Sequence, residues 1–471
     1  MRTLVMKFGG STVGTTTALT QLASIVLTER ERWDRLVLVV SALDGITDQL
    51  TEAAQFAQLS QRRGYRRIAA TLRARHLALI DHLIKPSERS SLLPAIDSLL
   101  YDMLSVCQAM SDNPADTRQD AIDAVIGVGE RLSARIVAAL LRQSRLRSVA
   151  IDATELIITD DVFGNATPNI MLTRQSIETQ LIPMLERGIL PVVTGFIGAT
   201  PSGTPTTLGR GGSDYTASIL GACMDASEVW IWTDVDGLMT TDPLDIETAR
   251  SIPQLSYDEA AELAYFGARV LHSRMVGLLQ QNQIPVRVRN VYDPQAPGTL
   301  IRDTPLAANR ASLQAVTMIT AIAVTAKRSG SLAALTQVVD EVFQTTTGTS
   351  VDVMIAAQSP HATFACFIVP TTSSPNASHD LQFALNDRIR STPHLHGWET
   401  MNVAVITLVG AALRRSHELT AQVLTHLDGM SILAVSYSPS RCGISIVMPI
   451  QDADEALRRL HQLIVPESNP Q

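Results

Sequence analysis

Two hydrophobic patterns alternate along the first 290 residues of the chain. Short unbroken apolar runs are typical of parallel strands that are buried on both faces. Between them lie longer segments in which apolar residues recur every three or four positions, as on one face of a helix. The predicted strands are Leu4–Phe8, Leu36–Val40, Val149–Asp152, Leu190–Gly195, Val229–Thr233 and Pro285–Asn290, and helices are predicted near Thr17–Arg30, over most of 48–143 and after the capping box Ser256–Glu259. The alternation predicts an α/β three-layer sandwich with a mainly parallel sheet.

The pattern changes in the C-terminal third, where one arrangement occurs twice. Residues 353–370 and 432–449 each contain a Ser-Pro pair and close on a proline, and each copy follows an apolar strand (Ala321–Thr325 or Val403–Val409) and a helical pattern. This predicts two α+β modules of the βαββ type. The predicted domains are a catalytic domain at 1–300 and two small modules at 313–385 and 398–467. Such modules pair and hold a ligand between them, or serve only as dimer contacts.

The composition of the chain disfavours several classes of function. The chain has 471 residues and a net charge of −8, and only 4% of its residues are aromatic. These values disfavour binding to nucleic acid or to a membrane surface. The 4 cysteines are far apart and form no CxxC pair, which favours a reducing cytoplasm over a disulfide framework or a structural zinc site. We expect no signal peptide and no membrane span, because no apolar run reaches 18 residues.

The stretch 207–217, TLGRGGSDYTA, carries the most specific chemistry. Its glycines let backbone N–H groups approach an anion, and the helix start that follows adds free N–H groups and a partial positive charge. Arg210 provides a fork that suits a carboxylate or a phosphate. Asp214 stands where such a site needs a metal contact or a partner for a lysine. The alternative is a glycine-rich turn before an ordinary helix.

Other loops follow predicted strands, at the sheet edge where α/β proteins bind ligands. Lys7 ends the first strand in KFGGST and suits a transferring phosphoryl group, although the segment lacks the Walker A pattern. Ser41 and Thr47 flank a Gly turn after the second strand. Glu130, in GVGERLS, suits a substrate ammonium group. Each residue has a simpler alternative: a solvated strand end, a plain turn, or an acid at a helix N-terminus.

Two further segments favour nucleotide contacts. WTDVDGLMTTDP (232–243) is rich in hydroxyls and acids, and Phe266–His272 carries Arg269 within reach of phosphates. Either segment could be only a connector. The histidines show no metal-ligand spacing, so no metal site of the protein's own is expected.

Taken together, these segments resemble the aspartate kinases of the amino-acid-kinase family. The matching motifs occur in the family's order, and the C-terminal repeat is similar to the family's paired ACT regulatory modules, so the resemblance covers essentially the whole chain. Met239, Leu244 and Arg269 depart from residues frequent in the family. The resemblance implies transfer of the γ-phosphoryl group of ATP, with Mg²⁺ carried by the nucleotide, to the β-carboxylate of L-aspartate, which gives 4-phospho-L-aspartate.

The resemblance also implies roles for individual residues. Lys7 stabilises the phosphoryl group in transfer with the Gly9 and Gly10 backbone, and Asp214 holds that machinery. Arg210 pairs with an aspartate carboxylate and Glu130 with its α-ammonium group. The implied substrate contacts are Ser41, Thr47, Glu130, Arg210, Gly211, Gly212 and Ser213, and the implied nucleotide contacts are Lys7, Gly9, Gly10, Ser11, Thr233, Asp234, Met239, Arg269 and Val270.

Regulation and assembly follow from the repeat. Lys327, Ser329, Gly330 and Asp352 are the expected effector contacts, with lysine or threonine as the effector. A homodimer or higher homo-oligomer is expected, because closed symmetric assemblies are common. Two alternatives remain: a kinase of the same fold acting on glutamate, a carbamate or a nucleoside monophosphate, and a catalytically silent amino-acid sensor.

Overall fold

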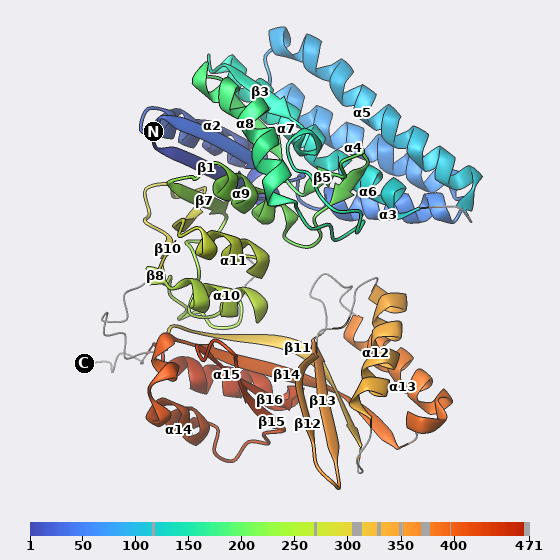
Figure 1. Ribbon diagram of the computed structural model, residues 1–471, viewed down its shortest axis with the longest axis vertical. Helices are drawn as coiled ribbons and strands as arrows, with labels where there is room; N and C mark the ends of the chain where they lie inside the picture. The colour runs from blue at the N-terminus through green and yellow to red at the C-terminus, as the bar shows by residue number, and fades with distance from the viewer. Residues whose placement is uncertain are drawn as a thin grey trace. The chain divides into compact units, whose positions relative to one another are not determined.

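The computed structural model describes residues 1–114, 118–267, 271–303, 313–326, 331–347, 351, 353–368, 377–395 and 397–465. The described residues form two compact units (Figure 1). The first contains 1–238, 251–257 and 271–303, and the second contains 239–250, 258–267 and the described residues from 313 onward. The units therefore interleave in sequence. The domain limits predicted from the sequence stay a prediction.

An eight-stranded sheet in the order β3-β4-β2-β1-β7-β9-β10-β8 is the centre of the first unit. Neighbouring strands from β3 to β9 are parallel, β10 is antiparallel to β9, and β8 is parallel to β10. The strands are β1 (Thr3–Phe8), β2 (Arg35–Val40), β3 (Ser148–Ile151), β4 (Leu190–Thr194), β7 (Glu228–Thr233), β8 (Gln254–Leu255), β9 (Val286–Asn290) and β10 (Thr299–Ile301). A short hairpin, β5 (Ile197–Ala199) and β6 (Pro205–Thr207), stands outside this sheet.

Helices cover both faces of this sheet (Figure 1). Helices α8 (Ile170–Glu186) and α9 (Gly212–Cys223) pack on one face, and α11 (Ser273–Gln281) packs against α9. The other face carries α2 (Thr16–Arg30) and α7 (Val128–Gln143), with a helical layer outside them. That layer contains α3 (Ile46–Gln58), α4 (Arg62–Leu83), α5 (Pro86–Asp112) and α6 (Gln119–Ile126), and the single turn α1 (Gly10–Val13) follows β1.

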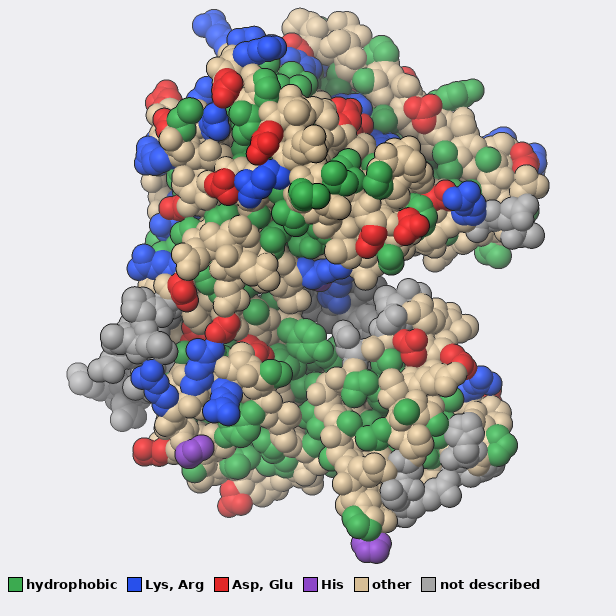
Figure 2. Space-filling view, viewed as in Figure 1, with side chains coloured by type: hydrophobic (Ala, Val, Ile, Leu, Met, Phe, Trp, Pro, Cys, Tyr) green, Lys and Arg blue, Asp and Glu red, His purple; other side chains and the backbone are tan. Residues whose placement is uncertain are grey.

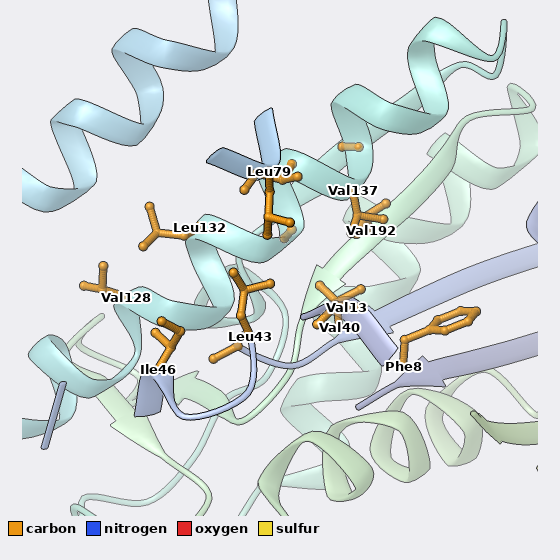
Figure 3. Close-up of a cluster of buried hydrophobic side chains, with 14 of the residues drawn as sticks. Phe8, Val13, Val40, Leu43, Ile46, Leu79, Val128, Leu132, Val137 and Val192 are labelled. Atoms are coloured by element: carbon orange, nitrogen blue, oxygen red, sulfur yellow. The ribbon is translucent and has the colours of Figure 1, made fainter. Parts of the chain in front are cut away.

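The main core lies between the sheet and α7. Phe8 and Val40 at the strand ends are fully buried, and Val128, Leu132 and Val137 of α7 face the same cluster (Figure 3). The burial of β1 and β2 on both faces explains why their sequences are continuously apolar rather than alternating. This packing fixes the strand ends from which the loops of the site emerge.

The second unit contains one six-stranded antiparallel sheet in the order β12-β13-β11-β14-β16-β15. Its strands are β11 (Ala315–Ala326), β12 (Val353–Gln358), β13 (Thr363–Ile368), β14 (Trp398–Val409), β15 (Ala434–Tyr437) and β16 (Gly443–Pro449). Its helices are α10 (Tyr257–Tyr265), α12 (Leu332–Thr347), α13 (Ala377–Ser391), α14 (His417–His426) and α15 (Ala453–Gln462). Short 3-10 turns at Ala153–Glu155 in the first unit and at Pro393–Leu395, Ala411–Arg414 and Ile450–Asp452 in the second complete the described elements.

The two predicted repeats share this sheet. Strands β11 and β14 are each 12 residues long and pair with each other along their whole length. Each of these strands therefore continues from its own repeat into the other one. The sequence predicted only Ala321–Thr325 and Val403–Val409 of these strands, and the remaining residues of each strand pair with the other long strand. The α/β sandwich followed by two ACT-like modules is confirmed.

Two segments from the predicted catalytic domain, 239–250 and 258–267, belong to the second unit. The Thr240 hydroxyl shares a buried hydrogen bond of 2.9 Å with Nε2 of His461 on α15, and the Thr240 carbonyl accepts from Val316 N. In the segment 258–267, a carboxylate oxygen of Glu259 accepts from the backbone N–H of Ala411 at 2.8 Å. Residues 239–250 and 258–267 are thus anchored by the C-terminal repeats.

The surface carries both signs of charge. On the face seen in Figure 2, acidic and basic side chains are interspersed over both units. No described helix is long and apolar enough to cross a membrane. All 4 cysteines are buried and unpaired, and burial raises the pKa of the Cys366 thiol to about 12.

Candidate active site

An ion pair joins the end of β1 to the start of α9. Lys7 Nζ lies 2.5 Å from Oδ1 of Asp214, and each side chain is only 11% exposed. Lys7 is close to the last residue of β1, and Asp214 lies in the first turn of α9. The geometry matches the sequence expectation that Asp214 is the partner of a lysine.

The two glycines after β1 lie in close contact with their neighbours, including Lys7. A Cβ on Gly9 would lie 3.5 Å from Lys7 Nζ and 3.9 Å from the carbonyl oxygen of Trp232 in β7. A Cβ on Gly10 would come within 3.1 Å of the Ala42 carbonyl oxygen. A side chain at either position would therefore crowd the surroundings of the ammonium group, and glycine lets the backbone come close to a bound anion there.

The loop that follows β2 connects this corner to α7. The backbone N–H of Ser41 donates to the Phe8 carbonyl at 3.1 Å, and that of Ala42 donates to Oε1 of Glu130 at 3.2 Å. Ser41 and Thr47 are both half-buried on this loop and the start of α3. The residues from KFGGST, SALDGIT and GVGERLS thus lie at one edge of the sheet.

Glu130 is the most unusual charge at this edge. The residue is 3% exposed, and its second carboxylate oxygen, Oε2, has no hydrogen-bond partner among the described residues. Burial raises the pKa of Glu130 to about 7, while the Ala42 N–H opposes that rise. A buried carboxylate with a free oxygen is incomplete, and an ammonium group would supply the missing partner.

The glycine-rich turn, residues 209–212, leads directly into α9. Gly211 has a φ of +68° and a Cβ there would lie 2.5 Å from the His272 side chain. Gly212 packs in the same way against Phe196. Arg210 on this turn is an exposed residue, and partial desolvation of its guanidinium lowers its pKa. Ser213 is 8% exposed and lies against Gly195, at the end of β4.

Three residues that the sequence analysis did not assign also line this corner. Phe196 adopts a positive φ of +68°, and its N–H donates to Thr216 Oγ1 at 3.0 Å. His272 is the N-cap of α11, and burial lowers its pKa while Asp214 opposes the shift. Arg274 donates to the Leu208 carbonyl at 3.1 Å. The motif Phe266–His272 pointed toward His272, whereas nothing in the sequence marks Phe196.

The nucleotide contacts expected from the sequence are only partly described. Ser11 lies in α1, and Thr233 ends β7 beside β1, with its hydroxyl 3.2 Å from Asp234 Oδ1. Met239 belongs to the second unit. Arg269 and Val270 lie outside the described residues, as do Lys327, Ser329, Gly330 and Asp352. Among the described residues, no cluster of three or more His, Cys, Asp or Glu side chains has a metal-binding arrangement.

Comparison with known proteins gives the same picture. The amino acid kinase family model matches residues 2–290, and an ACT domain model matches residues 406–463. The lysine-sensitive aspartokinase 3 of Escherichia coli strain K12 is 30% identical over 464 residues, which cover 97% of this chain and 98% of that protein. The chain belongs to the aspartokinases of the amino acid kinase family.

Solved aspartokinase structures agree in fold over nearly the whole chain. The E. coli aspartokinase III complex with aspartate and ADP (R-state) aligns with a TM-score of 0.79 at 27% identity, over 98% of this chain and 100% of that one. The complex of aspartokinase III with lysine and aspartate (T-state) aligns with a TM-score of 0.77 at 28% identity, over 98% and 99%. The aspartokinase resemblance predicted from the sequence motifs is therefore confirmed.

Proposed function

We propose that this aspartokinase transfers the γ-phosphoryl group of ATP to the β-carboxylate of L-aspartate, giving 4-phospho-L-aspartate and ADP. The observation that carries the proposal is the joint placement of the Lys7–Asp214 ion pair and the incomplete Glu130 carboxylate at one sheet edge. One provides positive charge for a phosphoryl group, and the other provides an acceptor for an amino-acid ammonium group. The product is an acyl phosphate that opens amino-acid biosynthesis from aspartate.

The chemistry needs positioning and charge rather than a protein nucleophile. A β-carboxylate oxygen of aspartate forms the new bond to the γ-phosphorus, and the bridging bond to the β-phosphate breaks with its electron pair on ADP. The acceptor is already an anion, so no general base is required. Lys7 and the N–H groups around Gly9 and Gly10 offset the charge on the transferred oxygens. Mg²⁺ carried by ATP supplies additional neutralisation there when bound.

The acceptor is selected by groups at both of its ends. Glu130 holds the α-ammonium group, and Arg210 pairs with a carboxylate. Ser41, Thr47, Ser213 and the N–H groups of Gly211 and Gly212 line the same pocket. Ser11, Thr233, Asp234, Met239, Arg269 and Val270 serve the nucleotide. The presence of Lys7 and Asp214 argues against a silent sensor.

A panel of acceptors tests the proposal. The full-length protein with ATP and Mg²⁺ is expected to release ADP with L-aspartate, and to do so far more slowly with L-glutamate, carbamate or a nucleoside monophosphate. Hydroxylamine should trap the acyl phosphate as the hydroxamate in the aspartate reaction. ADP release with another acceptor, and none with aspartate, would replace the proposal with that alternative.

Control by an amino acid is the second part of the proposal. Its support is the ACT repeat together with the anchoring of residues 239–250, which include Met239, by Thr240 and His461. An effector bound to the ACT modules can thereby act on a segment assigned to the nucleotide. Lysine is the first effector to test, since a similar aspartokinase is lysine-sensitive, and threonine is the second. The idea fails if neither changes the rate at millimolar concentration.

Location and assembly complete the proposal. Buried, unpaired cysteines suit a reducing cytoplasm. The six-stranded sheet of the second unit ends in the edge strands β12 and β15, which are suited to pairing between subunits. Sedimentation of the full chain is expected to give a homodimer or a larger homo-oligomer.

A further inference from the structure

A buried carboxylate in α6 joins two loops of the first unit. Asp123 is 1% exposed, and its Oδ2 accepts from the backbone N–H of Gly164 and from that of Thr207, both at 2.8 Å. The two loops are distant from α6 in sequence. Hydrogen bonds to a charged acceptor are stronger than neutral ones, so this single oxygen is a firm anchor for both.

Thr207 lies two residues before Gly209, the first glycine of the glycine-rich turn. It ends β6, and its carbonyl accepts from the Ala166 N–H at 2.9 Å. Asn165 continues the contact, because its Oδ1 accepts from Arg274, which also donates to the Leu208 carbonyl. A Cβ on Gly209 would lie 2.5 Å from this Asn165 oxygen. The loop around 164–166 thus supports the turn from one side.

The turn itself needs such support. Gly209, Gly211 and Gly212 give it large conformational freedom, and fixing that freedom is entropically costly. Arg210 lies among these glycines, and its guanidinium is useful only at a defined position. A displacement of about 1 Å at a substrate-positioning group can reduce turnover by about 100-fold.

Stability alone does not account for a carboxylate here. Burial raises the pKa of Asp123, and the N–H groups of Gly164 and Thr207 oppose this rise together with the Thr207 and Gln119 side chains. None of these partners carries a positive charge. Burying a carboxylate among neutral groups is costly, and what this one provides is a single oxygen that orders two loops at once.

We propose that Asp123 is a positioning residue for the acceptor: it fixes the start of the glycine-rich turn and, through it, Arg210. The proposal rests on the proposed aspartate kinase function for the identity of the acceptor. Thr233 ends β7 and Asp234 follows it, and β7 is held by β1 and β9 instead. Loss of the anchor therefore weakens binding of the amino acid and leaves nucleotide binding largely unchanged.

Steady-state kinetics of the full-length enzyme test the inference. Asp123→Ala is expected to raise the KM for aspartate about tenfold or more, while the KM for ATP stays within about twofold. Asp123→Asn keeps an oxygen that can accept both N–H groups and is expected to restore most of the aspartate KM. Parallel increases in both KM values, or an unchanged aspartate KM, would overturn the proposal.

Glu29→Ala is the matched control. Glu29 is also a buried carboxylate, 5% exposed, and accepts from Arg32 Nη1 at 3.0 Å and Trp33 Nε1 at 3.1 Å, near the end of α2. Its loss is expected to lower thermal stability without changing either KM. If Asp123→Ala does not fold, Asp123→Ser takes its place, because the shorter serine side chain cannot accept from both N–H groups; its aspartate KM is expected to be at least twofold above wild type, and an unchanged value would contradict the proposal.

Amide hydrogen exchange separates this inference from the proposed function. Peptides covering 160–166 and 205–212 are expected to exchange at least tenfold faster in Asp123→Ala than in wild type, while peptides from β7 keep their rates. Unchanged exchange in both loops would contradict the anchor. Wild-type enzyme that fails to phosphorylate aspartate would refute the proposed function, yet the exchange result would still decide whether Asp123 fixes the turn.

Discussion

Lys7 and Asp214 form a nearly buried ion pair with an Nζ–Oδ1 distance of 2.5 Å. The pair joins the first strand of the sheet to the first turn of α9, so it brings a fixed positive charge to the N-terminal end of a helix. Both features favour an anion at the same place. The ammonium group lies close to the backbone of Gly9, where a Cβ would come within 3.5 Å of Lys7 Nζ.

Lys7→Ala is expected to lower kcat by about 100-fold to 1000-fold, because it removes the charge that offsets the transferred phosphoryl group. Single-turnover ADP formation measures the effect. Lys85→Ala is the control, since that lysine is exposed before α5. Near-normal turnover of Lys7→Ala would contradict the assigned role.

The Glu130 carboxylate predicts a pH dependence of substrate binding. With its pKa raised to about 7 by burial, Glu130 is mostly protonated at pH 6 and mostly ionised at pH 8. Only the ionised form pairs well with an ammonium group, so the KM for aspartate should fall several-fold, up to about tenfold, between these pH values. Calorimetry in buffers of different ionisation enthalpy should detect proton release on binding.

Glu130→Gln provides the control for that profile. The glutamine variant is expected to bind aspartate weakly, with no change in KM attributable to this group between pH 6 and 8. A wild-type KM that is constant over this range would contradict the assignment of the ammonium site.

The same group predicts a stability difference with a definite sign. The pKa of Glu130 is about 7 in the folded protein and near its ordinary value of 4.5 in the unfolded chain. As the pH rises, the unfolded chain therefore loses this proton before the folded protein does. Wild-type stability therefore falls between pH 4.5 and 7 relative to Glu130→Gln, by on the order of 3 kcal/mol in total. Thermal unfolding of both proteins at pH 5 and pH 8 measures this. If the stability advantage of Glu130→Gln over wild type were smaller at pH 8 than at pH 5, this prediction would be wrong.

Two glycines with positive φ provide a matched pair of substitutions. Gly211→Ala places a Cβ 2.5 Å from the His272 ring, whereas Gly203→Ala places one where nothing lies within 4 Å. Both sites have a left-handed backbone, with φ of +68° and +85°, so both variants carry a similar strain of about 1 kcal/mol. Gly211→Ala is expected to reduce kcat/KM at least tenfold and Gly203→Ala less than twofold. Equal losses in the two variants would indicate a backbone effect only.

Local patterns were sufficient to predict much of this molecule. The apolar runs around Val5 and Val37 gave the central strands, and the glycine motifs gave Lys7, Glu130, Arg210 and Asp214 as residues of one sheet edge. The prediction was less complete where a strand serves two repeats, because β11 and β14 extend into pairings that neither repeat reveals alone.

Several features of the site had no local signal. Phe196 has a positive φ, contacts Gly212 and donates its N–H to Thr216, and this backbone state is not encoded by the residue type. In the sequence, Asp123 is one acidic residue on an amphipathic helix, with nothing that marks it as special. Its importance comes from two N–H groups that the fold brings to it.

The amino-acid sequence by itself determined the order of strands and helices and the chemical groups available at each loop, because these follow from hydrophobic periodicity and from glycine's backbone freedom. Only the tertiary structure decided the partner of Lys7, the free oxygen of Glu130 and the anchor of the glycine-rich turn. Those properties depend on distances between segments far apart in the chain and on exclusion of water around them, and neither is a property of a short stretch of sequence.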